Sequence, residues 1–223
     1  GVSGTTTSPA SRPTTAAVQN RSVIGSIING ENITIESGNY NMLAIGTDLE
    51  LTQGVRGSNL LGKNTYTNLP GIHLGGGYMN DNPALGIKGY AQSGNVILHY
   101  KDSWADTQIY NLDIEGVPGE YITLPDDTIW SCLMNTTILD TGTGYYCTGQ
   151  YSFGMQKIGG VANDTGITVI NELNGTAYTF VFDIDTATDV TQHRINLQVN
   201  GLGVTTQTFI VTASIQYQQN KSL

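Results

Sequence analysis

The most constraining feature of the sequence is the stretch from Gly119 to Met155, which has the pattern of two long strands joined by a tight turn. Apolar side chains fall at even positions on the first strand and at odd positions on the second: Trp130, Cys132, Met134 and Ile138, then Tyr145, Cys147, Tyr151, Phe153 and Met155. Alternation with a period of two is typical of strands that bury one face. The stretch therefore predicts a β-hairpin with one apolar face.

The turn Asp-Thr-Gly-Thr-Gly sets the register of this hairpin. If Asp140 pairs with Tyr145, both apolar sets lie on the same face. This register predicts three cross-strand pairs: Trp130 with Met155, Cys132 with Phe153, and Met134 with Tyr151. It also separates Cys132 from Cys147 by roughly 20 Å along the strands, whereas a disulfide requires Cα atoms within ~7 Å. We therefore expect two buried thiols, and a disulfide would require a different register.

The entry to the hairpin resembles a known family. The run from Tyr110 to Gly116, followed by Leu-Pro-Asp-Asp-x-x-Trp from Leu124 to Trp130, is similar to the entry of the C-terminal β-domain of bacteriophage tail-fibre and related virion fibre proteins. The similarity covers about the second half of the chain, and the Leu-Pro-Asp-Asp-x-x-Trp piece is its specific part. The resemblance implies a homotrimeric protein located in the virion and assembled in the host cytoplasm. It implies no catalytic residue.

Composition favours an all-β chain without a nucleic-acid partner or membrane insertion. Only 12% of residues are charged and 28 are Gly, a composition that suits strands and tight turns. The formal charge of −9 disfavours nucleic acid and anionic membrane surfaces, because both attract basic proteins. No run approaches the ~20 apolar residues of a membrane-spanning helix.

The first part of the chain divides into an arm and a Gly-rich region. Residues 1–20 are rich in Thr, Ser, Ala and Pro, which predicts an extended arm. The fibre resemblance implies that this arm contacts other virion proteins of the capsid or tail. Residues 21–103 contain an aliphatic residue followed by Gly at irregular spacing: Ile24-Gly25, Ile45-Gly46, Leu61-Gly62, Leu74-Gly75 and Leu85-Gly86. This pattern predicts either the stacked rungs of a β-roll or an irregular Gly-rich β region.

Residues 104–223 form the predicted C-terminal domain. In addition to the two strands of the hairpin, the sequence has strand patterns at 109–115, 120–124, 167–171, 177–184, 194–199 and 205–217. Strands at this spacing predict an antiparallel β-sandwich of the jelly-roll type.

The sequence presents no catalytic, cofactor-binding or metal-ligating residue. His73, His99 and His193 are scattered and match no catalytic motif. Asp183, Asp185 and Asp189 form one acidic cluster, but Ca²⁺ takes six to eight oxygens and the spacing is not that of an EF-hand, so we expect a solvated loop. A glycan-degrading enzyme needs paired carboxylates at a cleft, which the sequence does not locate. We therefore expect a non-enzymatic protein without a cofactor.

Two functions remain open at this point. The first is a virion structural protein, a trimeric fibre or spike module of a bacteriophage, in which exposed Tyr residues and Trp104 bind host surface glycans by stacking on sugar rings. Three copies are expected because the short rungs carry few large apolar residues and one copy would not offset the entropy of ordering them. The alternative is a bacterial carbohydrate-binding module or a cell-surface adhesin.

Overall fold

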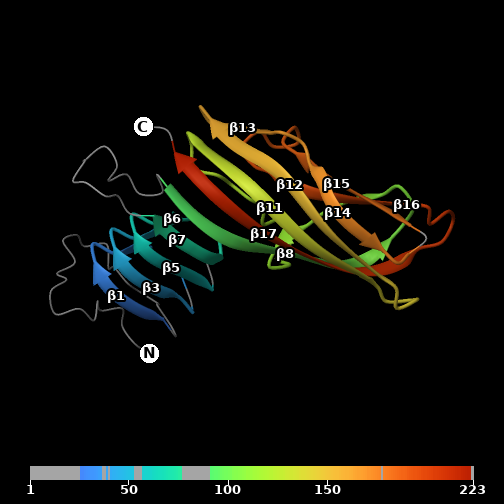
Figure 1. Cartoon of the computed structure of the whole chain (residues 1–223), viewed down its shortest axis with the longest axis horizontal. Coiled ribbons are helices and arrows are strands. Elements are labelled where there is room, and N and C mark those ends of the chain that lie inside the picture. Colours follow the sequence, from blue (N-terminus) through green and yellow to red (C-terminus); the bar gives the residue numbers. More distant parts are fainter. Residues whose placement is uncertain are drawn as a thin grey trace. The chain divides into compact units, whose positions relative to one another are not determined.

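The structure, a computed structural model, describes residues 26–36, 39, 41–52, 57–76, 91–176 and 178–221. Every regular element in these ranges is a β-strand (Figure 1), which confirms the predicted all-β class. The predicted arm at 1–20 lies outside the described residues, as do Ile24-Gly25 and Leu85-Gly86. Within the described residues, no helix has the length and apolar composition needed to span a membrane.

The chain divides into two compact units. Unit 1 takes the described residues up to Asn95 together with the end of the last strand from Gln218, and unit 2 takes Val96–Tyr217. The division falls inside two long strands, β8 (Ala91–Trp104) and β17 (Gln207–Lys221). The boundaries expected from the sequence, at residues 20 and 103, stay predictions.

Unit 1 is built from short parallel strands that stack side by side (Figure 1). One stack contains β1 (Ile27–Glu31), β3 (Leu43–Thr47), β5 (Ser58–Lys63) and β7 (Gly71–Gly76). A second stack contains β2 (Thr34–Ile35), β4 (Glu50–Leu51) and β6 (Tyr66–Thr67). The start of β8 pairs antiparallel with β7. The structure thus has the stacked rungs expected of a β-roll.

A ladder of glycines runs through the first stack. Gly30, Gly46, Gly62 and Gly75 are successive partners on β1, β3, β5 and β7. A Cβ atom on any of the first three would overlap the carbonyl oxygen of the next glycine, so the rungs approach closely only because these side chains are absent. The first two steps of the ladder are 16 residues long, the spacing that also joins Asn32 to Asp48. The step from Gly62 to Gly75 is shorter, at 13 residues. The aliphatic-Gly pairs of the sequence missed the first rung of this ladder, because Gly30 follows a polar residue.

Each rung turns its corner at a residue with left-handed backbone. Asn32, Asp48 and Asn64 have φ of 52°, 58° and 57°, values that Asn and Asp tolerate better than other residues with side chains. The Asn32 amide donates to Asp48 Oδ1 at 2.9 Å, which joins one corner to the next. Inside the corners lies an aliphatic core: Ile28, Ile33, Ile35, Met42, Ala44, Leu49, Leu51 and Leu60.

The larger sheet of unit 2 contains the predicted hairpin. Its strands β11 (Thr128–Asp140) and β12 (Tyr146–Ile158) pair in the expected register, with Trp130 opposite Met155, Cys132 opposite Phe153 and Met134 opposite Tyr151. In unit 2, β17 lies between β8 and β11. Shorter strands complete the sheet: β10 (Asp113–Ile114) on β8, and β13 (Val161–Asp164) and β14 (Thr168–Asn174) on β12.

The two cysteines are buried free thiols, as the hairpin register predicted. Burial raises the pKa of the Cys147 thiol to about 11 and raises the pKa of Cys132 as well. Neither sulfur therefore carries a reactive thiolate near neutral pH.

A second sheet of unit 2 contains β9 (Ile109–Asn111), β16 (Arg194–Asn200) and β15 (Thr179–Asp185), with β16 in the middle. Its inner face contacts the larger sheet through rings: Tyr151 and Phe182 lie 4.9 Å apart by ring centroids. Two predicted strands were partly wrong. The stretch 120–124 forms only the bridge between Ile122 and His193, and 109–115 is interrupted at Leu112. The jelly-roll connection stays a prediction.

Candidate binding site

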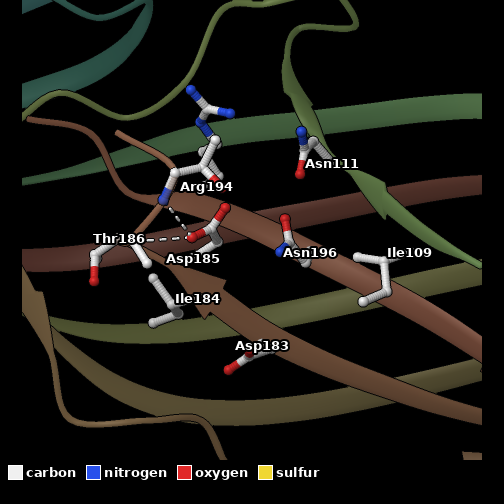
Figure 2. A pocket seen from close by; sticks show the side chains of 10 residues that line it. Ile109, Asn111, Asp183, Ile184, Asp185, Thr186, Arg194 and Asn196 are labelled. Carbon is white, nitrogen blue, oxygen red and sulfur yellow. Dashed lines mark hydrogen bonds between the residues drawn. The ribbon is translucent and has the colours of Figure 1, made fainter. Parts of the chain in front are cut away.

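The outer face of the three-stranded sheet carries a row of polar side chains. Asp183 on β15 lies opposite Asn196 on β16, and Asn196 lies opposite Asn111 on β9. Successive side chains of a strand alternate between its two faces, so Asp183 points away from the buried Phe182 and Ile184. Its cross-strand partners Asn196 and Asn111 share this outer face. The row therefore holds one carboxylate and two carboxamides on three neighbouring strands (Figure 2).

These residues line an open hollow with a volume of about 570 Å³. Ile109 forms its apolar side, and the loop that follows β15 forms one end. Asp185 holds this loop, because its Oδ1 accepts hydrogen bonds from the backbone N–H groups of Ala187 at 2.9 Å and Thr188 at 3.0 Å (Figure 2). A hydrogen bond from the Thr188 side chain is the main cause that lowers the pKa of Asp185.

Arg194 lies beside the row, opposite Asp185 on the neighbouring strand. Its guanidinium carbon lies 4.7 Å from the centre of the Tyr121 ring, a cation–π arrangement. One terminal nitrogen donates to Gln192 Oε1 at 3.5 Å, which is a long contact. The Nε atom is buried and has no hydrogen-bond partner among the described residues.

Asn196 lies at the centre of the row. The residue is only 9% exposed, and its Oδ1 atom is buried without a hydrogen-bond partner in the described part of the chain. Its neighbour Asn111 donates to the Tyr121 hydroxyl at 3.2 Å. Buried polar atoms without partners cost free energy and are uncommon in folded proteins, so Asn196 Oδ1 and Arg194 Nε are the two unusual atoms of this site.

The acidic cluster considered from the sequence does not assemble. Asp183 points into the hollow, Asp185 holds its own turn, and Asp189 accepts from the backbone N–H and the hydroxyl of Thr191. Among the described residues, no three His, Cys, Asp or Glu side chains are grouped so as to hold a metal ion.

Each of the three histidines contacts a backbone carbonyl or a hydroxyl group of its own surroundings. His73 is buried and its Nε2 contacts the Leu69 carbonyl at 3.0 Å. His99 contacts the Thr212 hydroxyl at 3.2 Å. His193 is buried, its Nε2 donates to the carbonyls of Gln156 and Asn163, and burial lowers its pKa.

The aromatic residues differ from the expected sugar-stacking surface. Trp104 is fully buried and stacks on Tyr110 with ring centroids 4.9 Å apart, so it is not available to a ligand. Tyr145 and Tyr146 lie exposed at the end of the hairpin. Sequence reasoning missed Asn111, Arg194 and Asn196, because nothing in the local pattern of a strand shows which residues of distant strands will be its partners.

Comparisons with known proteins return only distant structural likenesses. No protein-family model matches the chain, and no curated protein matches it. The tailspike protein gp49 of Acinetobacter baumannii bacteriophage Fri1, described as a capsular polysaccharide depolymerase, matches 86% of this chain and 35% of its own at 11% identity and a TM-score of 0.30. The tailspike of Acinetobacter phage vB_ApiP_P1 matches 90% of this chain and 49% of its own at 10% identity and a TM-score of 0.30.

A third solved structure, the tailspike of Acinetobacter baumannii phage AM24, matches 78% of this chain and 33% of its own at 11% identity and a TM-score of 0.29. The chain thus spans between a third and a half of these proteins. At such TM-scores the likeness assigns neither a fold family nor an activity.

The expectation of a non-enzymatic protein is nevertheless contradicted, because the Fri1 tailspike is described as a depolymerase. The expectation rested on the absence of a readable motif. Catalytic carboxylates can be brought together from distant strands, which a motif search does not detect. We therefore withdraw it.

Proposed function

We propose that the chain is a spike or fibre module of a bacteriophage virion, which assembles with further copies of itself through unit 1 and binds host surface glycans through unit 2. The similarity of Leu124 to Trp130 to the entry of virion fibre domains supports this role, and so do the stacked rungs of unit 1. The observation that carries the proposal is an aliphatic face on the first stack of strands.

This aliphatic face consists of two rows of side chains on β1, β3, β5 and β7. One row contains Ile27, Leu43 and Ile72, and the other contains Ile45, Leu61 and Leu74; Asn29 and Asn59 are the polar members of the two rows. Ile27 is 63% exposed and Ile72 is 47% exposed. A third row, Glu31, Thr47 and Lys63, is polar.

A flat apolar face bordered by a polar row has the composition of a protein interface. Soluble monomers rarely leave a contiguous apolar patch in water, and stable interfaces combine an apolar centre with a polar rim. If each copy of the chain contributes its aliphatic face to a closed ring, the ring covers the aliphatic face of every copy. The fibre resemblance implies three copies, and three is the number we propose.

The first prediction concerns this assembly. Light scattering on the purified chain is expected to give about three times the 23.8 kDa of one chain, with no change on dilution to micromolar concentration. The double variant Ile45→Lys with Leu74→Lys is expected to lose this mass, because burying two unpaired charges in an interface is strongly unfavourable.

The matched control is Gln216→Lys, an exposed position on β17 in unit 2, which is expected to keep the wild-type mass. Circular dichroism of each variant reports whether the strands are retained. A folded wild-type monomer would contradict the proposed assembly and favour the single-chain binding module.

A further inference from the structure

We propose that the hollow on the outer face of β9, β15 and β16 binds one neutral sugar unit, with Asn196, Asn111 and Asp183 as its hydrogen-bonding residues. This inference rests on the proposed glycan-binding role of unit 2 and names its site. It starts from two buried atoms of residues that line the hollow, Asn196 Oδ1 and Arg194 Nε, which have no hydrogen-bond partner among the described residues.

The two unsatisfied groups require opposite partners. Asn196 Oδ1 accepts a hydrogen bond, whereas Arg194 Nε–H donates one. They belong to residues two apart on β16, so both side chains lie on the same face of that strand. A hydroxyl group can both donate and accept, and a sugar ring carries several hydroxyls on adjacent carbons. The chemistry of a polyhydroxylated ring therefore matches both needs.

The charges of the hollow disfavour other ligand classes. Asp183 and Asp185 both line it, so an anion would meet two carboxylates. A divalent cation would meet the Arg194 guanidinium and find Asp185 already committed to the N–H groups of its own loop. Hard cations also take six or more oxygen ligands, which these residues do not supply. A neutral ligand remains.

The spacing of the row also fits a ring of sugar size. Asp183, Asn196 and Asn111 lie on three neighbouring strands, which are ~4.8 Å apart in a sheet. Their planar carboxylate and carboxamide groups can each contact two adjacent hydroxyls, as planar groups do in bidentate recognition. Ile109 lies at the side of the row and provides an apolar surface for the C–H face of the ring.

Saturation-transfer-difference NMR on the full chain tests the site, because it detects weak binding to a large protein. The probes are glucose, galactose, mannose and N-acetylglucosamine, each at millimolar concentration. At least one is expected to receive saturation from the wild-type protein. The signal is expected to fall at least tenfold in Asn196→Leu and in Asp183→Ala. Asn171→Ala, an exposed carboxamide on β14 outside the hollow, is expected to keep it.

The Asn196→Leu variant separates a binding role from a structural one. Leu has nearly the shape of Asn and removes an acceptor that has no partner in the described part of the chain, so the thermal unfolding midpoint is expected to stay the same or to rise. A lower midpoint would mean that the carboxamide supports the fold and would overturn the inference. Absence of binding to all four sugars, or binding that survives both substitutions, would overturn it as well.

The mass of each variant distinguishes this inference from the proposed assembly. Asn196→Leu and Asp183→Ala are expected to keep the wild-type mass, since neither residue lies on the aliphatic face of unit 1. Sugar binding by a monomer would support the site and reject the assembly. A trimer that binds none of the four sugars would reject the site and leave the assembly standing.

Discussion

At the scale of single residues, Trp130 has the largest side chain that the hairpin buries in the core of unit 2. Its ring lies parallel to that of Tyr217, with the centroids 3.7 Å apart, and the residue is only 2% exposed. Its strand partner Met155 is also buried. The neighbouring Ser131 points to the opposite face and is exposed.

Replacement of this indole is expected to destabilise unit 2 strongly. Trp130→Ala removes a buried aromatic ring and leaves a cavity beside Tyr217, which typically costs about 3–5 kcal/mol of unfolding free energy. Chemical denaturation followed by tryptophan fluorescence measures the loss. Ser131→Ala is the control and is expected to change the unfolding free energy far less. Equal effects at both positions would mean that the hairpin buries its other face.

His73 makes the stability of unit 1 depend on pH. Its Nε2 donates to the Leu69 carbonyl, which can only accept, and burial lowers its pKa to about 4 from the ordinary 6.5. Above pH 6.5 the imidazole is neutral in both states. Between pH 6.5 and 4 the His73 imidazole is protonated in the unfolded chain but still neutral in the folded chain. The free energy of unfolding therefore falls as the pH falls.

The size of this effect is on the order of 3 kcal/mol between pH 6.5 and 4, at about 1.4 kcal/mol for each pH unit. His73→Gln keeps an N–H donor but does not titrate, so its unfolding free energy is expected to change less over the same range. Denaturant unfolding at a series of pH values compares the two proteins. Parallel pH profiles would show that another group is responsible.

At the scale of elements, the glycine ladder decides whether the rungs of unit 1 can stack. A Cβ atom on Gly46 would overlap the Gly62 carbonyl oxygen, and the backbone there has φ of 147°, which residues with a side chain rarely adopt. Gly159 also has positive φ, at 57°, but a Cβ there would meet nothing within 4 Å.

These two glycines provide a matched pair of substitutions. Gly159→Ala is expected to cost about 1–2 kcal/mol, the strain of a left-handed residue with a side chain. Gly46→Ala is expected to cost distinctly more, because the added atom also separates β3 from β5. Thermal denaturation of both variants checks the order. A smaller loss of stability in Gly46→Ala than in Gly159→Ala would mean that the rungs can move apart without a cost in free energy.

At the scale of the whole molecule, each of the two units has an apolar core of its own residues. The core of unit 1 lies among its short rungs, and that of unit 2 lies between its two sheets. Damage to one core is therefore expected to remain local. In hydrogen exchange followed by mass spectrometry, Gly46→Ala should speed exchange in β3 and β5 and leave β11 and β12 protected. Loss of protection in both units would indicate a single cooperative core.

Local pattern alone determined the all-β class and the register of the hairpin. The alternation of Trp130, Cys132 and Met134, together with a turn that pairs Asp140 with Tyr145, involves residues close in sequence, so each strand specifies its own partner. The buried thiols followed from the same register. The recurrence of Gly in the first half left both stacked rungs and an irregular Gly-rich β region open, and the pairing of the strands decided for the rungs.

Only the tertiary structure decided which residues of distant segments meet. Trp104 looked like a ligand surface in the sequence but is buried against Tyr110, and Gly30 joined the ladder although it follows a polar residue. The row of Asp183, Asn196 and Asn111 comes from three strands whose pairing no local pattern specifies. The physical reason is that alternation selects a face of one strand, whereas the neighbours on that face depend on the pairing of whole sheets.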